Sequence, residues 1–257
     1  MAYEHHSTSP VPVLEVRDLR VSFELHAIER RVEALRGVSL SVAAGEHVAL
    51  AGSSGAGKSS LLKSVYRTYL ADSGEVVLHR GDGSSIELGS LTDRELLDVR
   101  AADIGYVSQF LRAEPRRSAL DVVTRAGLRR GLDADQAADA AVQALREVNL
   151  VEELWHTYPT LLSGGEKQRV NLAAGTIAPP RLLLLDEPIS SLDPTNREAV
   201  LDRIAHLTEL GVAVLAVFHD GDAMRRLADR VVVLDAGLVV DAGPPDLVLA
   251  EAVGVAS

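Results

Sequence analysis

The segment GSSGAGKSS, residues 52–60, decides the fold of this chain. It matches the pattern G-x-x-x-x-G-K-[ST], in which glycines let the backbone curl so that successive N–H groups point at a phosphate. A short apolar run, EHVALAG at 46–52, precedes it, and KSSLLKSVYRTYL at 58–70 follows it with the composition of a helix. A strand, a phosphate loop and a helix in this order predict a nucleotide-binding α/β domain.

The residues of this loop have separate expected tasks. Lys58 is expected to reach the β- and γ-phosphates, and the Ser59 hydroxyl is expected to bind Mg²⁺. The remaining residues offer backbone N–H groups, and the helix that follows offers its positive end. The predicted nucleotide-binding residues of the loop are Gly52, Ser53, Ser54, Gly55, Ala56, Gly57, Lys58, Ser59 and Ser60. The loop alone does not separate kinases, GTPases, helicases and transport ATPases.

A second part of the site, which is acidic, is predicted in RLLLLDEP, residues 181–188. Four leucines form a buried strand that ends in Asp186 and Glu187. In an open parallel sheet, ligands bind at the carboxyl ends of the strands, so both acids are expected beside the phosphate loop. Asp186 is expected to bind Mg²⁺ directly or through water, and Glu187 to polarise an attacking water molecule.

Apolar strands and helices alternate along much of the remaining chain. This alternation predicts a parallel sheet that is covered on both faces. A block of helical spacing between about residues 112 and 162 interrupts it and is expected to be an inserted lobe. The further strands are expected within 13–42, at 103–109, 212–220 and 230–237, with a hairpin at 74–88 and a helix at 195–210 that ends before Gly211.

The segment LLSGGEKQRV, residues 161–170, begins a helix with two glycines, although glycine is a poor helix former. Ser163 and Glu166 have the S-x-x-E spacing of a capping box. Gly164 and Gly165 leave the first backbone N–H groups of the helix uncovered by side chains. A helix start with uncovered N–H groups is an anion site. The chain therefore offers phosphates two binding elements, which suggests a nucleotide held from two sides.

The composition excludes several classes of function. The chain has 257 residues and a net charge of −11, which argues against a nucleic-acid partner and against an anionic membrane surface. It has no cysteine, so disulfides and thiolate metal sites are absent. The beginning of the chain does not have the pattern of a signal peptide, and no apolar run approaches the roughly 18 residues of a membrane span. We expect a cytoplasmic protein without direct membrane insertion.

From about Leu14 to about Gly243, the chain resembles the ATP-binding cassette (ABC) ATPases. The resemblance rests on the phosphate loop, VSQF with Gln109, LSGGEKQR at 162–169, LLLLDEP at 182–188, SSLD at 190–193 and FHD with His219. It implies that ATP and Mg²⁺ bind between two cassettes paired head to tail. Each ATP would then lie between the loop of one chain and the signature residues of its partner, Ser163, Gly164, Gly165 and Glu166.

The same resemblance implies roles for single residues. Glu187 is the expected catalytic base, Gln109 senses Mg²⁺ and the γ-phosphate, and His219 contacts the γ-phosphate. Asp193 is expected at the seam between the two cassettes. Phe23 is expected to stack on adenine, with a core aromatic as the alternative.

The resemblance also implies a domain plan. A flexible tail is expected at 1–12, a single ABC ATPase domain at 13–243 and a C-terminal tail at 244–257. Within that domain, residues 13–109 and 164–235 are expected to form a RecA-like core with an antiparallel β subdomain, and residues 110–163 a helical subdomain.

Several segments resemble one branch of the family more closely, the L subunit of the phosphonate carbon–phosphorus (C–P) lyase system. They include FLRAEPRRSALDVV after Gln109 and LWHTYPTLLSGGE before the signature helix. This implies a partner in the lyase assembly, in the ATP-dependent step that joins an alkylphosphonate to a nucleoside triphosphate. Arg112, Arg116 and Arg117 are expected to dock that assembly, with solvated surface charges as the alternative.

Two rival functions stay open at this point: the ATPase subunit of a membrane transporter, of the importer or lipoprotein-export type, and a nucleotide-dependent clamp that hydrolyses slowly. Glu187 argues against the clamp. The phosphonate substrate, and whether the partner cassette is a second copy of this chain, also stay open.

Overall fold

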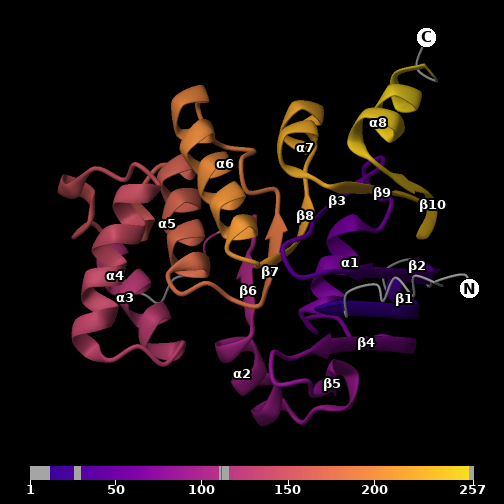
Figure 1. Ribbon diagram of the computed structural model, residues 1–257, viewed down its shortest axis with the longest axis horizontal. Helices are drawn as coiled ribbons and strands as arrows, with labels where there is room; N and C mark the ends of the chain where they lie inside the picture. The colour runs from indigo at the N-terminus through magenta and orange to yellow at the C-terminus, as the bar shows by residue number, and fades with distance from the viewer. Residues whose placement is uncertain (1–11, 26–29, 110, 112–115, 255–257) are drawn as a thin grey trace, which may run out of the picture.

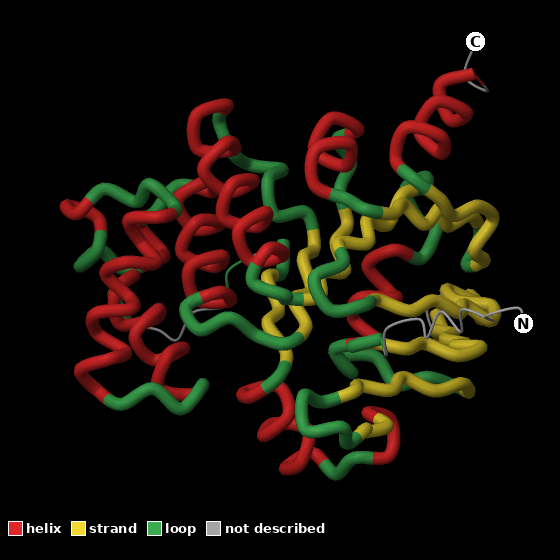
Figure 2. The backbone as a smooth tube through the Cα atoms, viewed as in Figure 1, coloured by secondary structure: helices red, strands yellow, loops and turns green. Residues whose placement is uncertain are grey.

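The structure is a computed structural model that describes residues 12–25, 30–109, 111 and 116–254. Its strands gather at one end of the molecule and its longer helices at the other (Figures 1 and 2). The strands are β1 (Leu14–Leu25), β2 (Arg30–Val42), β3 (His47–Ala51), β4 (Ser73–His79), β5 (Ser85–Glu87), β6 (Ile104–Val107), β7 (Leu182–Asp186), β8 (Ala213–Val217), β9 (Arg230–Asp235) and β10 (Leu238–Gly243). The α-helices are α1 (Lys58–Val65), α2 (Asp93–Ala102), α3 (Ala119–Arg129), α4 (Ala134–Glu147), α5 (Gly164–Thr176), α6 (Pro194–Glu209), α7 (Gly221–Leu227) and α8 (Pro245–Gly254).

A six-stranded sheet forms the centre, in the order β10-β9-β3-β8-β7-β6. All neighbours pair in parallel except β10 and β9, which are antiparallel. The leucines of β7 alternate between two core clusters, because successive side chains of a strand point to opposite faces. Both faces of the sheet are therefore buried, and the predicted α/β fold with a covered parallel sheet is confirmed.

A second sheet, in the order β2-β1-β4-β5, is antiparallel throughout. It shares a core cluster with α1 and one face of the central sheet. The predicted hairpin is present as β4 and β5, with His79 opposite Ser85. This antiparallel sheet thus covers the face of the central sheet on which α1 lies.

Helices α3 and α4 lie beside α5 at the end of the molecule away from β1, β2 and β4 (Figure 1). Local sequence sets their starts, because each begins with a capping box, Ser118 with Asp121 and Asp133 with Gln136. Their alanines and valines pack in the same cluster as the outer face of β7. Two 3₁₀ turns, Glu152–Leu154 and Pro159–Leu161, lead the chain from α4 to α5.

The structure differs from the sequence-based expectations in several elements. Residues 245–254, expected in a C-terminal tail, form α8, because Val248 and Leu249 bury against the central core. Helix α1 ends at Val65 rather than near residue 70, and Arg67 follows it with a positive φ of 58°. Helices α2 and α7 and strand β10 were not expected. The tail expected at 1–12 lies, except for Pro12, outside the described residues.

Within the described residues, none of the helices combines the length and the apolar character needed to cross a bilayer.

His47, at the start of β3, is fully buried, and neither ring nitrogen has a hydrogen-bond partner among the described residues. Its ring lies 5.8 Å from the ring of Phe218, centroid to centroid. Burial without a partner disfavours the charged imidazolium and lowers the pKa of His47 to about 3. In the unfolded chain a histidine binds a proton below about pH 6.5. The unfolded state therefore binds more protons than the folded state between these two values.

We expect His47 to make the protein less stable as pH falls below about 6.5, by about 1.4 kcal/mol per pH unit once His47 of the unfolded chain is protonated. When the pH falls from about 7.5 to about 5, the free energy of unfolding of His47→Leu should decrease by about 2 kcal/mol less than that of wild type. Urea unfolding at both pH values measures this difference. Replacing the exposed His206 by Gln controls for removal of an imidazole, and an unchanged pH dependence in His47→Leu would contradict the prediction.

Candidate functional site

The phosphate loop connects β3 to α1, as the sequence predicts. Gly57 is the N-cap of α1 with a φ of 107°, and a Cβ there would lie 2.6 Å from the backbone oxygen of Ala34. Lys58 is buried, and its Nζ donates to the carbonyl oxygens of Gly52 at 2.7 Å and Ser53 at 2.9 Å. The ammonium group therefore lies inside the curl of the loop, where it can exchange these carbonyls for phosphate oxygens.

The charge of Lys58 is balanced by the acids at the end of β7. Burial lowers the pKa of Lys58 below its usual value, and the negative charges of Glu187 and Asp186 oppose that shift. These acids therefore favour the charged form of the lysine, which is the form that can pair with phosphate.

Asp186 and Ser59 form the part of the site that fits a magnesium ion. The Ser59 hydroxyl donates to Oδ1 of Asp186 at 2.9 Å, and the Asp186 side chain is buried. Mg²⁺ prefers oxygen ligands and is usually bound by one or two protein groups together with substrate phosphates and water. A hydroxyl and a carboxylate in contact beside the phosphate loop match that preference, so these two residues would hold the ion.

Glu187 is the point on which the other two predicted catalytic side chains, those of Gln109 and His219, converge. Oε1 of Glu187 lies 2.8 Å from Nε2 of His219, and Oε2 accepts from Nε2 of Gln109 at 3.4 Å. The Glu187 backbone has a positive φ of 55°, and its N–H donates to the carbonyl oxygen of Val217. Non-glycine residues in this region of φ are uncommon and often found at functional sites, so the geometry marks Glu187 as a functional residue.

The predicted capping box at the start of α5 is confirmed. Ser163 N–H donates to Oε2 of Glu166 at 2.7 Å, and Glu166 N–H donates to the Ser163 hydroxyl at 3.3 Å. These bonds lower the pKa of Glu166 and keep its carboxylate charged at the helix start. Within the described residues, no hydrogen bond joins this segment to the phosphate loop of the same chain.

The two signature glycines have different neighbours. A Cβ on Gly165 would lie 2.9 Å from the backbone oxygen of Ser191, so glycine is needed there for close packing within the chain. A Cβ on Gly164 would have Ser191 Cβ, at 3.9 Å, as its nearest described neighbour outside the adjoining part of α5. Gly164 is exposed and lies beside a cavity of about 290 Å³ that Gln109 and Ser191 also line. Of these two glycines, Gly165 thus has a packing reason among the described residues of its own chain, whereas Gly164 has none there.

Other predicted residues have partners within the chain. Asp193 is the N-cap of α6 and accepts from the N–H of Asn196 at 3.1 Å. Phe23 is partly buried and meets the ring of Tyr69 edge-on at 4.8 Å, and its contact with adenine stays a prediction. Arg116 and Arg117 are exposed, whereas Arg112 lies outside the described residues.

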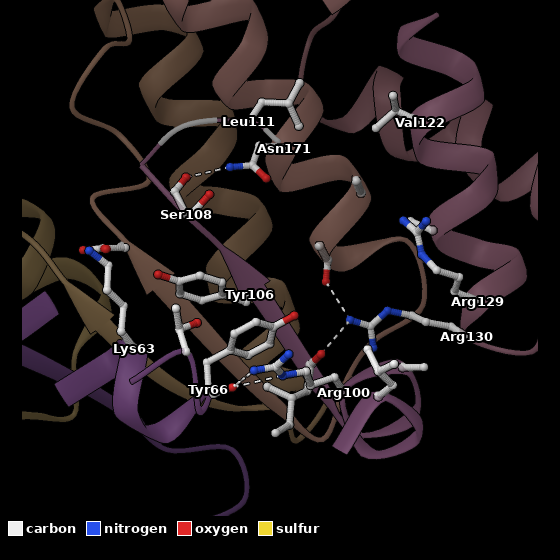
Figure 3. Close-up of a pocket in the computed structure, with 18 of the residues that line it drawn as sticks. Lys63, Tyr66, Arg100, Tyr106, Ser108, Leu111, Val122, Arg129, Arg130 and Asn171 are labelled. Carbon is white, nitrogen blue, oxygen red and sulfur yellow. Dashed lines mark hydrogen bonds between the residues drawn. The ribbon is translucent and has the colours of Figure 1, made fainter. Parts of the chain in front are cut away.

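A groove lies between α1, α2 and β6 on one side and α3 and α5 on the other, with a volume of about 560 Å³ (Figure 3). Its floor is a stack in which the Tyr66 and Tyr106 rings are 4.6 Å apart and Arg100 lies 4.2 Å from the Tyr66 ring. Arg130 donates to the carbonyl oxygen of Ile104, and its buried Nη1 has no hydrogen-bond partner in the part of the chain that the structure describes. Within the described part of the chain, the cationic residues that line this groove are Lys63, Arg100, Arg129 and Arg130.

Comparison with known proteins identifies the family of this chain. The family model described as ABC transporter matches residues 35–190. This chain belongs to the ABC transporter family. The predicted ABC-type fold and the predicted ATPase activity are thereby confirmed, and the chain is an ATP-binding cassette that hydrolyses ATP.

Several curated relatives of the cassette are import proteins. The methionine import ATP-binding protein MetN of Brucella abortus (strain 2308) is 36% identical over 234 residues, which are 91% of this chain and 60% of the relative. A putative peptide import ATP-binding protein of Brucella melitensis biotype 1 is 34% identical over 248 residues, covering 91% of this chain and 72% of the relative. The chain thus spans about three fifths of the methionine import relative.

Solved cassettes share the fold along almost their whole length. The cassette MJ0796, in a dimeric post-hydrolysis state bound to ADP and Pi, superposes with a TM-score of 0.81 at 28% identity, covering 90% of this chain and 98% of that one. A second dimeric structure of MJ0796 gives a TM-score of 0.82. These likenesses support the cassette fold of this chain.

The groove cations and Asn171 were missed by the sequence analysis. Lys63 and Arg100 lie on α1 and α2, while Arg129 and Arg130 end α3, so no local pattern brings them together. Asn171 stands in the middle of α5, and its only sequence signal is a poor helix former inside a helix.

Proposed function

We propose that this cassette works as one of a head-to-tail pair that hydrolyses Mg-ATP at two shared sites. The observation that carries this proposal is the convergence of Gln109 and His219 on Glu187, beside the Ser59–Asp186 contact. Lys58 and the N–H groups of the loop bind the phosphates. When bound at Ser59 and Asp186, Mg²⁺ neutralises charge on the β- and γ-phosphates.

In this proposal the Glu187 carboxylate accepts a proton from the attacking water molecule. Hydrogen bonds from Gln109 and His219 orient the carboxylate toward that water. The start of α5 in the partner chain offers the uncovered N–H groups near Gly164 to the γ-phosphate and closes the site against solvent. Asp193 lies near the seam of the pair, which suits its exposed position at the start of α6.

In the first and better supported candidate function, the pair drives an importer. The methionine and peptide import relatives match 91% of this chain, which favours a membrane permease as the partner. The ATPase would then act at the cytoplasmic face of that permease.

A second candidate is a role in the C–P lyase system, as the cassette of the assembly that activates alkylphosphonates. It rests on the segments around residues 110–123 and 154–166, which resemble the L subunit of that system. In this second candidate function, the same ATPase cycle changes the state of a lyase assembly.

The charge of the groove gives the partner a chemical character. Among the residues that the structure describes, four cations line it, and the one acidic residue there, Asp186, is buried and bonded to Ser59. In a chain with a net charge of −11, such a basic groove favours a partner segment that carries carboxylates. Because Gln109 also lines the groove, a segment docked there would lie next to the catalytic site.

Affinity purification of the tagged chain from detergent-treated native extract, with mass spectrometry of its partners, tests this proposal. We expect a membrane permease to co-purify, and Arg129→Glu to reduce its yield about tenfold because the groove loses complementary charge. Arg225→Glu makes the same charge change on α7, outside the groove, and should leave the yield within about twofold. Recovery of soluble lyase subunits instead would favour the second candidate, and equal yields from both variants would contradict docking in the groove.

A further inference from the structure

Asn171 is a buried amide in the middle of α5, only 7% exposed. Asparagine is a poor residue for a helix interior, and burying its amide costs free energy unless the amide is hydrogen-bonded. The Nδ2 group donates to the carbonyl oxygen of Ser108 at 2.6 Å, a bond visible in Figure 3. The side chain of this helix residue is therefore committed to a contact outside its helix.

The carbonyl that accepts this bond belongs to the peptide group that joins Ser108 to Gln109. Strand β6 ends at Val107, which pairs with Leu185, so Ser108 lies one residue beyond the last paired position of the ladder. The next side chain, that of Gln109, donates to Oε2 of Glu187. A bond from Asn171 thus fixes the backbone from which Gln109 extends toward the catalytic carboxylate.

Helix α5 crosses β6 at very short range next to this bond. A Cβ on Gly175 would lie 2.6 Å from Cγ2 of Val107, and a Cβ on Gly105 would lie 2.8 Å from the backbone oxygen of Gly175. Asn171 and Gly175 are four residues apart and therefore face β6 from the same side of the helix. Close packing at one point and the amide bond at the other leave α5 little freedom to move independently of Ser108.

The N-terminal end of α5 is at Gly164, which the proposed function places against the nucleotide of the partner chain. We propose that Asn171 is a positioning residue that holds the Ser108–Gln109 peptide in place, so that Gln109 reaches Glu187. Because the same helix begins at the signature residues, Asn171 also ties Gln109 to the helix that meets the partner's nucleotide. This inference rests on the proposed function and names a residue that this function does not require.

A matched control lies five residues further along the same helix. Thr176 is fully buried, and its hydroxyl donates to the carbonyl oxygen of Leu172 at 2.8 Å, within the helix. Thr176→Val removes a buried hydrogen bond from α5 without touching Ser108. Any effect on catalysis that comes merely from weakening α5 should therefore appear in this variant too.

The test compares Asn171→Leu and Asn171→Asp with wild type and with Thr176→Val. Leucine keeps the volume without a donor, and aspartate keeps the shape but places a carboxylate against the Ser108 carbonyl. Asn171→Leu should lower kcat for Mg-ATP about tenfold, with nucleotide affinity within about twofold, because Lys58 and the loop are unchanged. Asn171→Asp should lose at least as much, and Thr176→Val should stay within about twofold of wild type.

A double-mutant cycle with Gln109→Ala decides whether Asn171 acts through Gln109. If it does, Asn171→Leu in the Gln109→Ala background should lower kcat by less than about twofold further, because the group that it positions is already absent. Two losses that multiply, a Gln109→Ala variant as fast as wild type, or an equal loss in Thr176→Val would each overturn the inference. Thermal unfolding of every variant identifies misfolding, and if Asn171→Leu does not fold, the cycle is run with Asn171→Asp.

The proposed function fails separately, since it requires that wild type hydrolyse Mg-ATP and that Glu187→Gln not do so. Loss of activity in Glu187→Gln with full activity in Asn171→Leu would leave the proposed function standing and overturn this inference alone.

Discussion

Replacing Glu187 by glutamine is expected to reduce ATP hydrolysis at least about 100-fold, because positioned general bases typically contribute 100-fold to 10,000-fold. The amide keeps the size of the side chain and can still contact Gln109 and His219, which lie 3.4 Å and 2.8 Å from the carboxylate oxygens. It cannot accept a proton from water at neutral pH. The expected loss is therefore in kcat.

ATP binding should survive in Glu187→Gln and become somewhat tighter. Glu187 contributes negative charge close to Lys58, where the phosphates bind, and this charge opposes a bound triphosphate. Steady-state hydrolysis and equilibrium binding of a fluorescent ATP analogue separate the two effects, and size-exclusion chromatography with ATP should show an accumulated pair.

The matched control is Glu209→Gln, at the exposed end of α6, which makes the same chemical change far from the phosphate loop. It should hydrolyse ATP at the wild-type rate. A Glu187→Gln variant within about twofold of wild type would show that another group activates the water.

The sequence was most informative where a residue type is tied to local backbone chemistry. The phosphate loop, the apolar β7 strand and the capping box of Ser163 with Glu166 each depend on neighbours within a few positions. Those neighbours are visible in the chain itself. The acids at the end of β7 could also be placed, because parallel strands present their carboxyl ends at one edge of the sheet.

The parts that could not be predicted depend on contacts between distant segments. Asn171 and Ser108 are 63 positions apart, and no periodicity reports their contact. Helix α8 was expected as a tail, since its apolar residues gain a partner only after the chain has returned to the central core. The sequence also explained only in part why residue 165 is glycine. The fold adds that a Cβ there would lie 2.9 Å from the backbone oxygen of Ser191.

The second large effect concerns Gly164, whose side of the nucleotide site belongs to the partner chain in the proposed pair. Gly164→Val should fold, because among the described residues the nearest atom outside the adjoining part of α5 lies 3.9 Å from an added Cβ. It should still bind nucleotide through Lys58. Hydrolysis should fall at least about tenfold, because the valine side chain would cover the N–H groups that face the γ-phosphate.

Lys58→Ala should be inactive for the opposite reason, since it removes the cation that the loop places at the phosphates. Mixing Lys58→Ala with the impaired Gly164→Val chain then tests the pairing directly. In a mixed pair, one site combines both defects, whereas the other combines an intact loop with an intact signature helix. We expect activity to return to up to about one quarter of wild type, because about half of the random pairs are mixed and each has one intact site of two.

The comparison that makes this result specific is the Lys58→Ala and Gly164→Val double variant mixed with Lys58→Ala. Every chain in that mixture lacks Lys58, so no pair has an intact loop facing an intact signature helix. It should therefore stay inactive at every ratio. Recovery in the first mixture alone would show that two copies of this chain form the site. Its absence, with both variants folded and Gly164→Val still binding nucleotide, would contradict a homodimer, because an intact loop and an intact signature helix would then never meet.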